Sequence, residues 1–429
     1  MYLCKVKSKL NIKTVTSMRK IFTSVLVLFP LLAWGQTVGY NWNETTKTLQ
    51  LGGVDRTRNK SITLPDGATI VLSGENLLDF SAIDSCGFYC EGDLTIQGTG
   101  SLKITSNDDA ISATGNVTIK DCELSIQTID AEGIQIDGNL TISNAKVDLD
   151  TPEESLYPGG TLTIENNSVV TITSDKDGID SASDVYISDS EVTITSKSDA
   201  CINGNVTAKN STLVLNALGD NNQYDACFDA SYGETYSFEN CELTLVASNG
   251  GSIFSPKYES MMTKAAQLNF PEGVTMENTL CRVEEASSNS YYTAVIGAYT
   301  LDENLDITDN LIITEGSTLT IPKGITLTNS GTLANAGTIV IQQGGVMEGE
   351  ENGEIIRDSA TGIEDIEGAK VYAQEGTVYV QTPSRMKVAI VSISGATVAR
   401  AEQEGLQSYS LPKGIYIICI GEQTFKVRN

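Results

Sequence analysis

Apolar and polar residues alternate in short runs along most of the chain, and between Leu94 and Leu245 one such pattern recurs seven times. Each copy opens with a triplet whose outer positions are mostly apolar, and successive copies begin 23, 23, 22, 23, 21 and 30 residues apart. Alternation over so few residues predicts short, half-buried strands. The triplets are Leu94-Thr95-Ile96, Val117-Thr118-Ile119, Leu140-Thr141-Ile142, Leu162-Thr163-Ile164, Val185-Tyr186-Ile187, Val206-Thr207-Ala208 and Tyr236-Ser237-Phe238.

A second apolar pair follows each triplet after seven or eight residues, as in Leu102 and Ile104. Turn-forming residues separate the two strands of a copy. A period this short has no room for a helix, so the pattern predicts an all-β fold: a right-handed parallel β-helix with coils of about 21–23 residues. The turn formers are Asp121, Asn144, Asn166, Asp189, Asn210 and Asn240.

An acidic residue, a small residue and an apolar residue follow the second strand in six copies. If the coils stack in register at about 4.8 Å, the six carboxylates form one column. One hypothesis is that the column binds Ca²⁺, which would relieve the repulsion between like charges. The alternative is that each acid caps backbone N–H groups at a coil corner. The acids are Asp109, Glu132, Glu154, Asp177, Asp199 and Asp225.

The rest of the chain divides by changes in this pattern. Residues 36–255 form the parallel β-helix, whose weakly alternating first part is expected to cap its N-terminal end. Residues 256–307 show no repeat and are expected to form an irregular connecting region. Residues 308–349 predict a second, shorter β-solenoid punctuated by glycines, and the acidic residues 350–367 predict a linker. Residues 368–429 predict a C-terminal antiparallel β-sandwich.

Residues 1–35 have the organisation of a secretory signal peptide. They contain six basic and no acidic residues, followed by an apolar run from Ile21 to Leu32 and a small-residue site before Gln36. Met18 would be a natural start, in which case residues 1–17 would precede the true start. The run is short for a membrane span, so no transmembrane span is expected after cleavage. The expected location is secreted, extracellular or on the outer-membrane surface.

The composition excludes several functions. Without the leader the net charge is near −33, which argues against nucleic-acid binding because that requires clustered Lys and Arg. The chain has no histidine, which removes the most frequent general base and zinc ligand. Eight cysteines remain after the leader. Cys201 and Cys227 fall on equivalent positions of adjacent coils, where they are either a bridge or two stacked apolar side chains.

Two resemblances add to these inferences. The run Asp177-Gly178-Ile179-Asp180-Ser181-Ala182-Ser183-Asp184-Val185 resembles the repeats of secreted bacterial carbohydrate-binding-domain β-helix proteins, over roughly residues 45–250. The resemblance implies the fold, and a carbohydrate-binding role. Residues 368–429, with Val388–Gly395 followed by Leu411-Pro412-Lys413-Gly414, resemble the C-terminal sorting domains of type IX secretion cargo in Bacteroidetes. That resemblance implies secretion and sorting machinery as a partner.

The expected function is a non-enzymatic, exported β-helix protein that binds a glycan or another extracellular surface ligand. Sugar rings stack on exposed aromatic side chains, and the candidates are Tyr186, Tyr224, Tyr232 and Tyr236, of which Tyr236 is alternatively a core residue. The competing class is a surface adhesin or structural spacer. A polysaccharide lyase or glycoside hydrolase is a further alternative, although the lack of histidine and of any arginine between Arg58 and Arg282 argues against it.

Overall fold

The computed structural model describes residues 39–219, 224–230, 233–255, 262–263, 267–268, 270–286, 289–357, 369–374, 377–393, 395–421 and 423–429. Every regular element in these ranges is a β-strand, which confirms the all-β fold class. The predicted signal peptide lies outside the described residues. Within them, no helix is long and apolar enough to cross a membrane.

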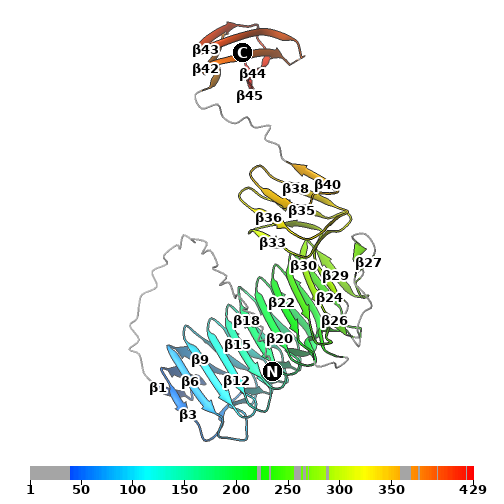
Figure 1. Cartoon of the computed structure of the whole chain (residues 1–429). Coiled ribbons are helices and arrows are strands. Elements are labelled where there is room, and N and C mark those ends of the chain that lie inside the picture. The colour runs from blue at the N-terminus through cyan, green and yellow to red at the C-terminus, as the bar shows by residue number, and fades with distance from the viewer. Residues whose placement is uncertain are drawn as a thin grey trace, which may run out of the picture. The chain divides into compact units, whose positions relative to one another are not determined.

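The β-helix has three faces, so each coil contributes three parallel strands (Figure 1). The first triplet of each repeat forms the first face, and the second pair forms the second face. The apolar residue that ends each acidic motif lies at the start of a third strand, which the sequence analysis did not predict. Two long strands, β19 (Ile179–Ser188) and β21 (Ala200–Lys209), belong to both the third and the first face.

The first face consists of β2 (Thr48–Gly52), β5 (Ala68–Ser73), β8 (Leu94–Gly98), β11 (Val117–Lys120), β14 (Leu140–Ser143), β17 (Leu162–Glu165), the ends of β19 and β21, β24 (Tyr236–Glu239) and β29 (Val274–Glu277). The second face consists of β3 (Asp55–Thr57), β6 (Glu75–Phe80), β9 (Ser101–Ser106), β12 (Glu123–Thr128), β15 (Lys146–Thr151), β18 (Val169–Ser174), β20 (Glu191–Ser196), β22 (Thr212–Ala217), β25 (Glu242–Ala247) and β30 (Thr279–Glu285). The third face consists of β4 (Ile62–Leu64), β7 (Phe88–Cys90), β10 (Ile111–Ala113), β13 (Ile134–Ile136), β16 (Leu156–Pro158), the starts of β19 and β21, β23 (Ala226–Asp229) and β26 (Ser252–Ser255).

The coils stack in register because most inward positions of their strands are apolar. Val117 lies between Leu94 and Leu140 on the neighbouring coils, and Leu124 lies between Leu102 and Val147. All six side chains are buried. A shift of one residue would turn each of these columns toward water, so the register is strongly specified. At the N-terminal end, β1 (Gly39–Asn43) pairs antiparallel with β2 and covers the first coil.

Residues 256–307, which the sequence predicts to be an irregular connecting region, contain regular strands. Strand β29 pairs with β24 and β30 pairs with β25, so one further coil is added to the β-helix. A short hairpin of β27 (Met262–Thr263) and β28 (Gln267–Leu268) precedes that coil. Strand β31 (Ser290–Ile296) then runs antiparallel to β30, and β34 (Asn310–Ile313) and β37 (Leu333–Asn335) follow it in parallel.

The second solenoid therefore shares a sheet with the first. In β34, Ile312 belongs to the core of the β-helix, whereas Leu311 and Ile313 belong to the second core on the opposite side of the strand. The other strands of this solenoid are β32 (Ala298–Thr300), β35 (Thr318–Ile321), β38 (Thr338–Ile341) and β40 (Glu354–Arg357) on one face, and β33 (Leu305–Ile307), β36 (Thr326–Asn329) and β39 (Val346–Gly349) on the other. Strand β40 falls inside the stretch expected to be a linker, and residues 358–367 lie outside the described residues.

The C-terminal region is a separate antiparallel sheet of five strands. Its central strand β42 pairs with β41, β43 and β44, and β45 pairs with β44. Its buried apolar residues, including Val378, Ile390 and Ile418, form one core. The strands are β41 (Lys370–Gln374), β42 (Thr377–Ser392), β43 (Thr397–Ser410), β44 (Ile415–Ile420) and β45 (Gln423–Arg428).

Candidate functional site

The corner between the first and second faces is built by the turn formers of the sequence repeat, which we call the asparagine corner: Asp121, Asn144, Asn166, Asp189, Asn210 and Asn240. All six have φ between 48° and 60°, the left-handed region that Asn and Asp enter more readily than other side-chain-bearing residues. A single residue in this conformation bends the chain sharply between two strands. The same residue type therefore recurs at this position in coil after coil.

The amide side chains of this corner also join neighbouring coils. Nδ2 of Asn144 donates to Oδ1 of Asp121 at 2.7 Å, and Nδ2 of Asn210 donates to Oδ1 of Asp189 at 3.1 Å. Asn240 in turn donates to Oδ1 of Asn210 at 3.2 Å. An amide carries both donors and acceptors, so a stack of such residues satisfies itself along the axis. These side-chain hydrogen bonds tie neighbouring coils together along the corner.

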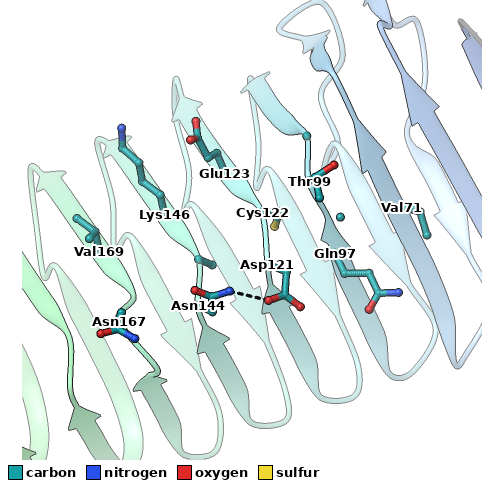
Figure 2. A pocket seen from close by; sticks show the side chains of 13 residues that line it. Val71, Gln97, Thr99, Asp121, Cys122, Glu123, Asn144, Lys146, Asn167 and Val169 are labelled. Atoms are coloured by element: carbon teal, nitrogen blue, oxygen red, sulfur yellow. Dashed lines mark hydrogen bonds between the residues drawn. The ribbon is translucent and has the colours of Figure 1, made fainter. Parts of the chain in front are cut away.

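A groove of about 780 Å³ runs along this corner (Figure 2). Its floor is the bent backbone at Cys122 and Ala145, and side chains from the ends of first-face strands and the starts of second-face strands form its walls. In Figure 2 the Asn144–Asp121 hydrogen bond lies along the groove, with Glu123 and Lys146 on the neighbouring strands. The lining residues are Val71, Gln97, Gly98, Thr99, Gly100, Asp121, Cys122, Glu123, Asn144, Ala145, Lys146, Asn167 and Val169.

Two smaller depressions extend the groove. One of about 280 Å³ shares Asn167 and Val169 with it and continues to Asn210. The other, of about 170 Å³, shares Glu123 and Lys146 and spreads over the second face to Lys103. From the coil of Val71 to that of Asn210 there are six steps of about 4.8 Å, which makes the groove about 29 Å long.

The groove offers polar contacts at every coil. Glu123 and Lys146 occupy the same register position on adjacent strands, so an acid and a base lie side by side. Gln97 and Thr99 add an amide and a hydroxyl one coil earlier. Aromatic rings are missing from the described lining, so any ligand here is held by hydrogen bonds and charge. The long, open shape fits an extended chain better than a small compact molecule.

The six acids predicted to form a column lie at the corner between the second and third faces, which we call the acidic corner. Neighbouring members interact. Asp109 and Glu132 are joined by a side-chain hydrogen bond, and burial, followed by the charge of Glu132, raises the pKa of Asp109 to about 7. Burial raises the pKa of Asp177 to about 8, although its Oδ1 accepts a hydrogen bond from the Ala200 N–H at 2.7 Å.

The acids also serve as local caps, as the alternative interpretation of the column expects. Asp225 is 1 % exposed, and its Oδ1 accepts a hydrogen bond from the Asp199 N–H at 3.0 Å. On β19, three residues after Asp177, burial and then the charges of Glu154 and Asp229 raise the pKa of Asp180 to about 6. Among the described residues, no group of three or more acids or cysteines is arranged to hold a metal ion.

Residues 44–250 match the family model of carbohydrate-binding domain-containing proteins. The matched segment contains the whole groove of the asparagine corner and all six acids of the acidic corner. It stops before the second solenoid and the C-terminal sheet. A comparison with curated proteins finds no match.

The four tyrosines selected from the sequence do not form one site. Tyr186 is 44 % exposed on the first face, where its hydroxyl donates to Oδ2 of Asp184 at 3.2 Å. Tyr224 is 40 % exposed beside the 30-residue coil, and Tyr232 lies outside the described residues. Tyr236 is a core residue at 1 % exposure, with its ring against Phe228 and Phe254, so it has no surface for a ligand.

Sequence reasoning missed the groove because it interpreted the asparagine corner only as a turn. A signal was present: the second residue after the turn former is charged in several coils, as in Glu123, Lys146 and Glu191. The concave angle between two strands cannot be detected from the spacing of hydrophobic residues.

The eight described cysteines are all free thiols, and Cys201 and Cys227 are fully buried in contact with each other.

Proposed function

We propose that the β-helix binds an extended polysaccharide along the groove of the asparagine corner. One observation carries the proposal: a continuous groove, lined by polar side chains that recur once per coil, lies inside the segment that matches a carbohydrate-binding family. The coil spacing of about 4.8 Å is of the same order as the length of one hexopyranose unit. Each sugar of an extended chain then meets a similar set of groups.

The chemistry of the groove suits sugar hydroxyls. Carboxylate, amide and ammonium groups such as Glu123, Gln97 and Lys146 supply acceptors and donors in alternation. Because no ring stacks on the ligand here, each sugar contributes little binding free energy. Affinity must then grow with chain length, as expected when many weak contacts act together.

The test is affinity electrophoresis of the full chain in gels that contain one of a panel of soluble plant, algal and bacterial polysaccharides. The double variant Glu123→Gln/Lys146→Ala removes both charges at the centre of the groove. We expect at least a tenfold loss of affinity for whichever polysaccharide retards the parent protein. Lys197→Ala is the matched control, because Lys197 is an exposed lysine of the same β-helix that pairs with Asp175 away from the groove.

Three outcomes decide between the functional classes. If a polysaccharide retards the parent protein and the Glu123→Gln/Lys146→Ala variant is not retarded, the result supports polysaccharide binding in the groove. Lack of retardation by any polysaccharide overturns it in favour of a surface adhesin or a structural spacer. Release of oligosaccharides overturns the non-enzymatic assignment that we propose together with it.

We further propose that the protein acts outside the cell. The support is the leader-like residues 1–35 and the resemblance of residues 368–429 to type IX sorting domains, whose partner would be secretion machinery. Cell fractionation and N-terminal sequencing of the protein from its natural source test this assignment. Recovery from the cytoplasm with the leader intact would overturn it.

Calcium remains a proposal for the acidic corner. The raised pKa values of Asp109 and Asp177 show that burial and neighbouring charge disfavour ionisation there, which is the condition that a bound cation would relieve. A melting temperature that rises with millimolar Ca²⁺ supports the proposal. An unchanged melting temperature overturns it.

A further inference from the structure

The third face of the β-helix carries a column of outward-pointing residues that contains two aromatic rings. Tyr89, Ser112, Gln135 and Tyr157 occupy the same register position on β7, β10, β13 and β16. In each strand the residues on either side are buried, so the middle residue points away from the core. Tyr157 is 39 % exposed, and Tyr89 is half-buried.

The spacing of the two tyrosines suits a linear sugar chain. Three coil steps separate them, which places the rings about 14 Å apart along the axis. Aromatic rings stack on the apolar faces of pyranose units while the ring edge leaves the sugar hydroxyls free. Between the rings, the hydroxyl of Ser112 and the amide of Gln135 are placed to bond the intervening units.

The column continues past Tyr157 with further polar groups. The pairing of Leu156 with Ile179 brings Tyr157 next to Asp180, and Asp180 lies opposite Asn203 on the following coil. All members from Ser112 to Asn203 except Tyr157 are half-buried, so they are partly desolvated and yet reachable. The acids near this end, Glu154 and Asp229, interact electrostatically with Asp180 and would repel an anionic sugar.

We propose that the third face is a second glycan site, which takes a short, neutral, linear oligosaccharide with one sugar stacked on Tyr89 and another on Tyr157. It differs from the groove of the asparagine corner in its strands and in its use of stacking. The proposal of this second site does not depend on the groove, because no residue of the column lines that groove. A chain with both sites offers two attachment points to one polysaccharide network.

The experiment is calorimetric titration of the full chain with linear β-1,4-linked hexasaccharides of glucose, mannose and xylose. Tyr157→Ala and Tyr89→Ala should each weaken binding by about tenfold, the scale of one lost stacking contact. Tyr157→Phe should restore the affinity, because the ring remains. Tyr186→Ala is the matched control, since Tyr186 is equally exposed but stands on the first face.

The outcomes separate this site from the groove. Loss with Tyr157→Ala and none with Glu123→Gln/Lys146→Ala supports a second site, whatever the groove does with long polysaccharides. Lack of hexasaccharide binding by the parent protein, or an equal loss with Tyr186→Ala, overturns it. If a variant has the melting temperature of the parent protein, its loss of binding is not caused by unfolding. If Tyr157→Ala is unstable, Tyr157→Phe is the variant that tests whether the ring at this position is enough for binding.

Discussion

The asparagine corner and the acidic corner turn the same chain at every coil, but they do so with different chemistry. In the first, a residue with positive φ bends the backbone and its amide donates a hydrogen bond to the preceding coil, as Asn144 does to Asp121. In the second, carboxylates gather where burial raises the pKa of Asp109 and Asp177. An amide stack satisfies its own hydrogen bonds, whereas a carboxylate stack has acceptors and no donors unless it holds protons.

The two corners show that regular stacking repeats the same side-chain interaction at every coil, whether that interaction is favourable or not. A neutral amide at 4.8 Å intervals becomes a ladder of hydrogen bonds, and an acid at the same intervals becomes a ladder of repulsions. The asparagine corner is therefore explained by stability. At the acidic corner the cost of gathering carboxylates is offset in part by the caps that they form, as Asp177 does for the Ala200 N–H and Asp225 for the Asp199 N–H.

The largest expected effect breaks the asparagine corner. Asn144→Val places a β-branched residue at φ 49° and removes the donor to Asp121, so we expect a loss of about 3 kcal/mol in unfolding free energy. Asn144→Gly keeps the backbone conformation and loses only the hydrogen bond, for about 1 kcal/mol. Urea denaturation measures both. Equal losses would show that backbone strain does not matter at this corner.

An intermediate effect is expected when one buried carboxylate of the acidic corner loses its charge. The pKa of Asp177 lies at about 8 in the folded chain and at 3.8 as its ordinary value, so the folded state holds the proton more tightly than the unfolded state does. Stability from this group is fully present below pH 4 and is lost as the pH rises toward 8.

Asp177→Asn keeps the acceptor for the Ala200 N–H and abolishes the charge. We therefore expect a gain of about 1–3 kcal/mol at pH 8.5 and almost none at pH 4. Thermal melts of both proteins across this range measure the difference. The same gain at both pH values would assign it to packing instead of charge.

The smallest effect concerns an ion pair at the edge of the acidic corner. Lys176 pairs with Glu153, and both side chains are about one-third exposed or more. Lys176→Ala should cost less than about 1 kcal/mol, and the cost should fall in high salt. Chemical denaturation at two salt concentrations measures it. A cost that does not respond to salt would mean that the lysine acts through packing of its stem.

Much of the β-helix could be predicted because its determinants are local and repeated. The inward apolar positions and the positive-φ turn formers recur at a fixed period, so the first two faces and the asparagine corner were correct. The third strand escaped notice because it has only three residues, and its first apolar residue, such as Ile134, also ends the acidic motif. Nothing in its length distinguishes such a strand from a turn.

The non-local features could not be predicted in the same way. Tyr236 opens the copy that follows the 30-residue coil, and only the packing of Phe228 and Phe254 around its ring shows that it faces inward. The groove depends on the angle between two faces, and the tyrosine column depends on three successive registers. Each requires the coils to be placed in space before the side chains can be compared.

The strand β34 has a consequence for how the molecule assembles. Its Ile312 needs the core of the β-helix on one side, while Leu311 and Ile313 need the second core on the other. Strand β31, to which it pairs, needs the edge of β30 as a template. The second solenoid therefore uses the end of the β-helix as its template. Its first layer cannot be completed until the last coil of the β-helix has formed, so we expect this part of the chain to fold in the order of the sequence.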